Sequence, residues 1–167
     1  MDMEDVFINK VHLSGIVTVD LVDYEPKEEI FFLDIKDFLF MGLIIKEKEF
    51  KEALSAFNWA SLKGKAVAVG CSEDTIIPTW VYFMFAERLH GIAMRIDYRS
   101  VDEVKNLIWK DKIMKADFTH LKDKKVVVKA NPVINADLFM AVVEKLRPLV
   151  VTLMYGEAGM PKVIYKR

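Results

Sequence analysis

The chain has 167 residues, of which 53% are hydrophobic and 29% charged, and its formal net charge is −1 at pH 7. This length suits one well-buried domain, and the composition excludes a disordered chain, which would have fewer aromatic residues and a larger net charge. The sequence pI of about 6.3 argues against nucleic-acid binding, because nucleic-acid-binding domains are usually strongly basic.

Membrane insertion and export are not predicted. No apolar stretch reaches 18 residues, and the first ten residues are acidic where a signal peptide would be basic. Cys71 is the single cysteine, so no intramolecular disulfide can form. We therefore expect a cytoplasmic protein that does not bind membranes.

Charge is distributed unevenly along the chain. Residues 1–60 hold 13 acidic and 6 basic side chains, whereas residues 61–167 hold 12 acidic and 18 basic ones. Two interpretations are open: the charges form the solvated faces of one domain, or opposite faces attract and produce a homo-oligomer.

The first 60 residues predict helices at both ends and strands between them. Residues 1–14 have a short amphipathic pattern, and residues 15–26 and 29–35 have the alternation of half-buried strands. We expect these strands to form an antiparallel pair at the edge of the sheet. Residues 36–45 predict a buried turn and strand, and residues 46–57 predict an amphipathic helix.

Residues 62–89 are the most informative stretch. Residues 65–70, KAVAVG, predict a buried strand with Cys71 at its carboxyl end. A helix should start between residues 73 and 78 and run to about residue 89. Its candidate N-caps are Ser72, Asp74 and Thr75. Because the helix is apolar nearly all round, we expect it to pack on two sides. The aromatic residues expected in the core are Trp80, Tyr82, Phe83 and Phe85.

The later part of the chain predicts parallel strands joined by helices. Residues 92–98 should form a strand parallel to 65–70, and Ser100 and Glu103 have the spacing of a capping box at the start of the next helix. The motif LKGKAVAVGC at residue 62 then returns as LKDKKVVVKA at residue 121, and strands are expected at 149–155 and 163–166.

The predicted fold class is α/β: a single domain, residues 1–167, with a mixed, mostly parallel sheet, helices on its faces and two similar strand-turn-helix-strand units. Residues 1–60 would be an acidic part with antiparallel edge strands, and residues 61–167 would supply the βαβ units.

The candidate site consists of four residues: Cys71, Asp74, Asn131 and Glu157. Ligands of open parallel sheets bind beyond the carboxyl ends of the strands, and a thiol at a helix N-terminus has its thiolate favoured by the helix dipole. The alternatives are an inert, buried Cys71 and an Asp74 that only caps a helix. We find no histidine spacing for a metal, no phosphate loop and no dinucleotide fingerprint, so we assign no metal-binding or cofactor-binding residue.

Several motifs resemble one family throughout the chain. GIVTVDLVDYEP, CSEDTIIPTWVY and LMYGEAG follow one another as in an uncharacterised bacterial family, domain of unknown function 2480. That family often has cysteines at three turns, of which this chain has only Cys71; the others fall at Ala130 or Asn131 and at Gly159. The resemblance implies an α/β fold and a link to iron–sulfur or metal metabolism.

Three functions follow as hypotheses. The first is a small accessory or binding protein with a protein partner, linked to iron–sulfur or metal metabolism through the resemblance. The second is an enzyme or binder of a small molecule, such as a phosphorylated metabolite, at the Cys71 edge. The third is a structural protein that associates with itself. The cofactor, if any, is unknown from the sequence.

Overall fold

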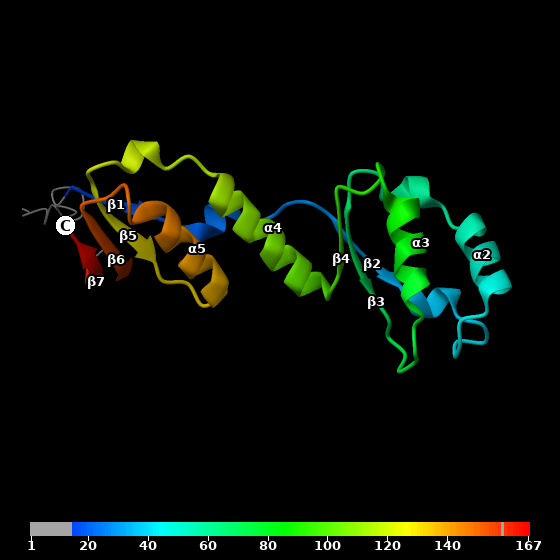
Figure 1. The fold of residues 1–167 in the computed structure, drawn as a ribbon. Helices are drawn as coiled ribbons and strands as arrows, with labels where there is room; N and C mark the ends of the chain where they lie inside the picture. The colour runs from blue at the N-terminus through cyan, green and yellow to red at the C-terminus, as the bar shows by residue number, and fades with distance from the viewer. Residues whose placement is uncertain (1–14, 158) are drawn as a thin grey trace, which may run out of the picture. The chain divides into compact units, whose positions relative to one another are not determined.

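The computed structural model describes residues 15–157 and 159–167, and its fold is α/β, as predicted (Figure 1). The amphipathic helix predicted for residues 1–14 lies outside the described residues. Contacts divide the chain into two compact units. Unit 1 holds the described residues up to Pro26 together with Ile108–Arg167, and unit 2 is Lys27–Leu107. That the whole chain behaves as one domain stays a prediction.

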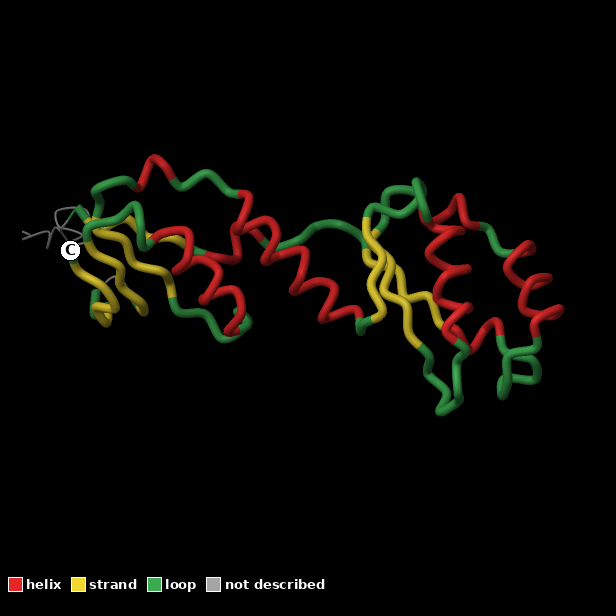
Figure 2. The backbone as a smooth tube through the Cα atoms, viewed as in Figure 1, coloured by secondary structure: helices red, strands yellow, loops and turns green. Residues whose placement is uncertain are grey.

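Unit 2 has a three-stranded parallel sheet in the order β2-β3-β4, with two helices on one face (Figures 1 and 2). Aromatic and aliphatic side chains from the strands and helices meet in a core that includes Phe50, Phe85 and Leu89. The elements are β2 Ile30–Asp34, the 3-10 helix η2 Ile35–Phe38, α2 Glu47–Ala56, η3 Trp59–Leu62, β3 Ala66–Gly70, α3 Thr79–Leu89 and β4 Arg95–Tyr98.

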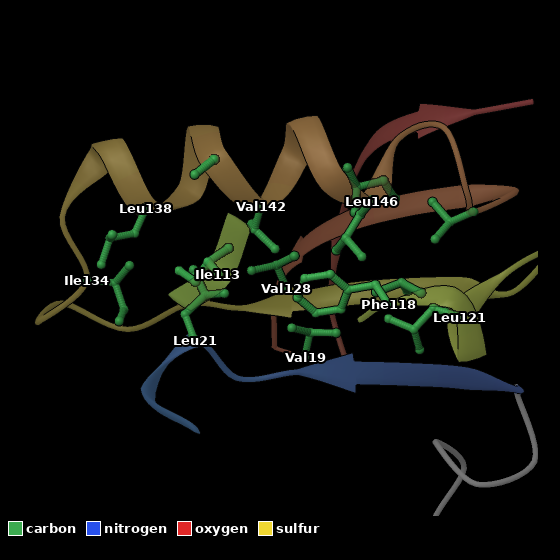
Figure 3. Close-up of a cluster of buried hydrophobic side chains, with 14 of the residues drawn as sticks. Val19, Leu21, Ile113, Phe118, Leu121, Val128, Ile134, Leu138, Val142 and Leu146 are labelled. Carbon is green, nitrogen blue, oxygen red and sulfur yellow. The ribbon is translucent and has the colours of Figure 1, made fainter. Parts of the chain in front are cut away.

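Unit 1 has a four-stranded sheet in the order β1-β5-β6-β7, in which only β7 runs antiparallel to its neighbour. Helix α5 lies along the sheet and contributes Leu138, Val142 and Leu146 to the core (Figure 3). The elements are β1 Ile16–Val19, η1 Leu21–Tyr24, α4 Val101–Lys115, η4 Thr119–Leu121, β5 Lys125–Lys129, α5 Ala136–Leu146, β6 Thr152–Gly156 and β7 Lys162–Lys166. The division between the units falls within α4.

The predicted capping box at the start of α4 is confirmed. The backbone N–H of Ser100 donates to Glu103 Oε2 at 2.9 Å, and the backbone N–H of Glu103 donates to Ser100 Oγ at 3.3 Å. Two donors at the helix start are thus satisfied reciprocally, which explains why the helix begins at Val101.

The two predicted strand-turn-helix-strand units are also confirmed, and they match in detail. The N–H of Gly64 donates to the Ile92 carbonyl at 2.9 Å, and the N–H of Asp123 donates to the Leu149 carbonyl at 2.9 Å. Gly64 and Asp123 both have positive φ, of 74° and 60°. The same turn therefore precedes β3 in one repeat and β5 in the other. The sequence match at residues 62 and 121 reflects a structural repeat.

The predicted antiparallel pair of edge strands is wrong. β1 pairs with β5 in one sheet, and β2 pairs with β3 in the other, and both pairings are parallel. A 3-10 helix capped by Asp20 follows β1, so the chain that leads from β1 to β2 is no tight hairpin turn. The single mixed sheet is accordingly replaced by two sheets.

Residues 36–45, for which a turn and strand were predicted, form the end of η2 and then a tight turn. After η2, Phe40 bridges Ile44 in an antiparallel contact, and Met41 and Gly42 adopt positive φ values of 52° and 70°. Five residues closing on themselves leave no length for a strand. The helix predicted for residues 46–57 is confirmed as α2.

Candidate functional site

The carboxyl end of the unit 2 sheet is held together by Asp34, the last residue of β2. Its Oδ1 accepts the backbone N–H of Lys36 at 3.0 Å and the backbone N–H of Ser72, just beyond β3, at 3.0 Å. Burial alone would raise the pKa of Asp34, but hydrogen bonds from Ser72 and from the Lys36 backbone outweigh it and lower that pKa. A carboxylate therefore joins two strand ends at the edge where Cys71 lies.

Cys71 lies with two tyrosines at this edge. The thiol is free and half-buried, and Cys71 packs against the unit 2 core. Tyr82 of α3 and Tyr98 of β4 make an edge-to-face contact, with ring centroids 5.1 Å apart and an interplanar angle of 71°. Burial raises the pKa of Tyr82, and the Tyr98 hydroxyl and the nearby Cys71 add to this effect. The sequence predicted the position of Cys71 but not its tyrosine neighbours.

Asp74 does not cap the central helix. α3 begins at Thr79, its N-cap position is Pro78, and no side chain caps it. Asp74 is exposed in the preceding loop, and the Thr75 hydroxyl instead donates to the Leu43 carbonyl at 2.7 Å. The three predicted caps were wrong, because residues 71–78 form an irregular loop and the helix begins only at Thr79.

The packing expected of the central helix is only partly found. Phe85 is buried and Tyr82 half-buried, but Phe83 is 73% exposed and Trp80 is also exposed. α3 therefore buries one stripe, which includes Val81, Phe85 and Leu89, and leaves apolar side chains on its other face.

The other two predicted site residues lie at the edge of the unit 1 sheet. Asn131 and Glu157 follow the neighbouring strands β5 and β6, and the N–H of Ala130 donates to the Gly156 carbonyl at 3.3 Å between them. Asn131 Oδ1 accepts the N–H of Val133 at 3.0 Å. Since β3 and β5 belong to different sheets, the predicted convergence of all four residues on one sheet edge is wrong.

Unit 1 repeats the arrangement around Asp34 with a different partner. Asp20 follows β1, accepts the N–H of Val22 at 3.1 Å and forms an ion pair with Lys129 Nζ at 3.0 Å. A signal for both carboxylates is present in the sequence, because VDLVDY at residues 19–24 has the same pattern as LDIKDF at residues 33–38. Sequence reasoning missed it by treating these segments only as strands and turns.

A metal centre is not supported by the donor set. Among residues 15–157 and 159–167, no group of three or more His, Cys, Asp or Glu residues is placed to hold a metal ion. An iron–sulfur cluster needs several thiolates, and Cys71 is the single cysteine of the chain. The cysteine content of this chain therefore does not fit an iron–sulfur cluster held by the chain alone.

The comparisons with known proteins show one family. The family described as "Protein of unknown function (DUF2480)" matches residues 5–167. The chain belongs to this family. No curated protein matches the chain, and no solved structure does. The family assignment therefore confirms the resemblance, and it adds no reaction. In the described part of the chain, every helix is too short or too polar to cross a membrane.

Asp20→Asn should show what the Asp20–Lys129 ion pair contributes. Asparagine keeps the oxygen that accepts the Val22 N–H and removes the charge. The hydrogen bonds from Lys129 and Val22 lower the pKa of Asp20 below its ordinary value of 3.8. The stabilisation is therefore fully present above pH 3.8 and is lost as the pH falls through the folded-state pKa.

We expect Asp20→Asn to lower the free energy of unfolding at pH 7 by about 0.5–1 kcal/mol, because the ion pair is partly exposed. Urea unfolding at pH 7 and pH 3 measures it, and the difference from the native chain should shrink at pH 3. Asp123→Asn, at the more exposed Asp123–Arg167 pair, is the control. An effect of the same size at both pH values would contradict the pKa direction.

Proposed function

We propose that this protein is an accessory protein that binds a partner protein through the apolar loops at the carboxyl end of the unit 2 sheet. The observation that carries the proposal is the exposure of apolar side chains on two adjoining loops. Met41 is 80% exposed and Ile76 is 91% exposed. We call this surface the loop patch; it consists of Met41, Leu43, Ile44 and Ile76.

The two loops of the patch are joined to each other. The hydrogen bond from the Thr75 hydroxyl to the Leu43 carbonyl fixes the loop after β3 against the turn before α2. Cys71 lies at the start of the first loop, so the patch adjoins the edge held by Asp34. Contiguous exposed apolar surface marks interaction sites in soluble proteins.

The backbone conformation of Met41 supports a role of this residue in partner binding. Met41 and Gly42 form the tip of the turn, both with positive φ. Such positions favour Gly, Asn or Asp, and a residue with a longer side chain costs about 1–2 kcal/mol there. Met41 has this unfavourable conformation and also exposes a flexible apolar side chain to water. A partner with an apolar groove would cover it, because methionine adapts to irregular surfaces.

The proposed compartment is the cytoplasm, where a free thiol such as that of Cys71 stays reduced. The proposal does not require chemistry at Cys71. Cys71→Ser should therefore leave partner binding unchanged, whereas an enzyme that uses the thiol would lose turnover.

The test uses a photo-crosslinking amino acid placed in the full chain at position 41 or 76. The matched control position is 133, because Val133 is 68% exposed and lies three residues before α5, as Ile76 lies three residues before α3. We expect one protein to cross-link from positions 41 and 76 and not from position 133. Ile76→Asp should then weaken binding of that purified protein at least about tenfold, because a charge would enter an apolar contact.

Two outcomes would contradict the proposal. One is equal cross-linking from position 133, which would indicate general stickiness of exposed apolar residues. The other is unchanged affinity of the purified partner for both Ile76→Asp and Met41→Asp. Val133→Asp serves as the control for the added charge.

A further inference from the structure

Unit 1 contains an apolar cavity of about 290 Å³ between α5 and strands β6 and β7. Its size is roughly twice the ~150 Å³ of an apolar cavity that admits a benzene ring. The lining side chains include Phe139, Val142, Val143, Leu153, Tyr155 and Ile164. Aliphatic and aromatic groups thus surround a space large enough for a medium-length hydrocarbon chain.

Strand β7 contributes to one wall of the cavity. The register between β6 and β7 shifts after Leu153, so that Leu153 faces Tyr165 and Met154 faces Val163. Ile164 is the extra residue of this bulge, and it lines the cavity. In unit 2, β4 is the last strand of its sheet, and no strand in the described part of the chain pairs with its other edge. β7 and its bulge are therefore a part of unit 1 that has no counterpart among the described strands of unit 2.

A positive charge lies next to Tyr155, one of the residues that line the cavity. Lys162 lies directly opposite Tyr155 in the β6-β7 register. Directly opposed residues have side chains on the same face of the sheet, so the Lys162 ammonium extends from the face on which the Tyr155 ring lines the cavity. Lys162 is exposed and forms no ion pair with any residue that the structure describes. A cation beside an apolar cavity complements an anion that has an apolar tail.

We propose that this cavity binds a medium-chain aliphatic carboxylate, with its tail between α5 and β6 and its carboxylate at Lys162. The Tyr155–Phe139 contact, with centroids 5.3 Å apart, places two rings beside the tail. The site is in unit 1 and is independent of the partner binding proposed for the loop patch.

The test is calorimetric titration of the full chain with decanoate, kept below the concentration at which it forms micelles. We expect saturable binding to one site. Val143→Trp should abolish it by filling the cavity from its rim, where Val143 is partly exposed. Phe83→Trp, on the corresponding helix of unit 2, should leave it unchanged. A circular dichroism melt of each variant shows whether it is folded.

The head group is tested separately with Lys162→Met and with decanol. Lys162→Met should weaken decanoate binding about tenfold, because it removes the charge-assisted hydrogen bond between the ammonium and the carboxylate. Decanol has no carboxylate, so it should bind the native chain and the variant equally. No saturable binding of decanoate, or equal binding by folded Val143→Trp, would overturn the site. Equal decanoate affinity of Lys162→Met would overturn the role of Lys162.

Discussion

Phe85→Ala should lower the free energy of unfolding of unit 2 by about 3–5 kcal/mol, the range found when a fully buried phenylalanine is truncated. Phe85 is a fully buried member of the aromatic core of this unit. Its ring makes edge contacts with Phe38 and Phe50, with centroids 5.0 Å and 5.6 Å away, and a tilted contact with Trp59. Alanine would remove all three contacts and leave a cavity that these rings cannot close together.

The control for this prediction is on the same helix. Phe83 is two residues earlier on α3 and is mostly exposed, so Phe83→Ala should change the free energy of unfolding by no more than about 0.5 kcal/mol. Urea denaturation followed by far-ultraviolet circular dichroism measures both variants. Equal effects of the two substitutions would contradict the burial of a single stripe of α3.

Leu89→Ala and Leu146→Ala should each cost about 2–5 kcal/mol, because both leucines are fully buried. They occupy the same place in the structural repeat, at the ends of α3 and α5. Leu89 belongs to the unit 2 core and Leu146 to the unit 1 core. Leu89→Ala should therefore destabilise unit 2, and Leu146→Ala should destabilise unit 1 through an equivalent substitution.

Hydrogen exchange read by mass spectrometry distinguishes how far each loss extends. If the units unfold separately, Leu89→Ala should speed exchange in β3 and β4 and leave β5 and β6 protected, and Leu146→Ala should do the reverse. Faster exchange in all four strands with either variant would show one cooperative domain, as the sequence predicted. The full chain is used throughout, so no isolated unit needs to fold.

The features predicted from the sequence are those set by nearby residues. The capping box depends on Ser100 and Glu103, which are only three residues apart. The valines in the runs KAVAVG and KKVVVK predict buried strands. The parallel pairing of β3 with β4 followed from the helix between them. The location of Cys71 after β3 followed from the same reasoning.

Strand partners far apart in the chain could not be predicted in this way. The alternation in residues 16–19 indicates a strand, but nothing in it selects β5 as the neighbour. The shared pattern around Asp20 and Asp34 was overlooked, and the partner of each carboxylate, Lys129 or Ser72, is too far away in the sequence to be predicted from it. The exposure of Phe83 was missed because apolar composition alone predicts burial.

Unit 1 is drawn from both ends of the chain, and this order has a consequence for synthesis on the ribosome. The three strands of unit 2 lie between residues 30 and 98 and emerge together. β1 emerges first, but its partner residues begin at Lys125, more than a hundred residues later. At translation rates of about 5–20 residues per second, roughly 5–20 s pass between the synthesis of β1 and the synthesis of β5. During that interval its apolar residues Ile16, Val17 and Val19 depend on chaperones, or on the nascent chain itself, to stay out of wrong pairings.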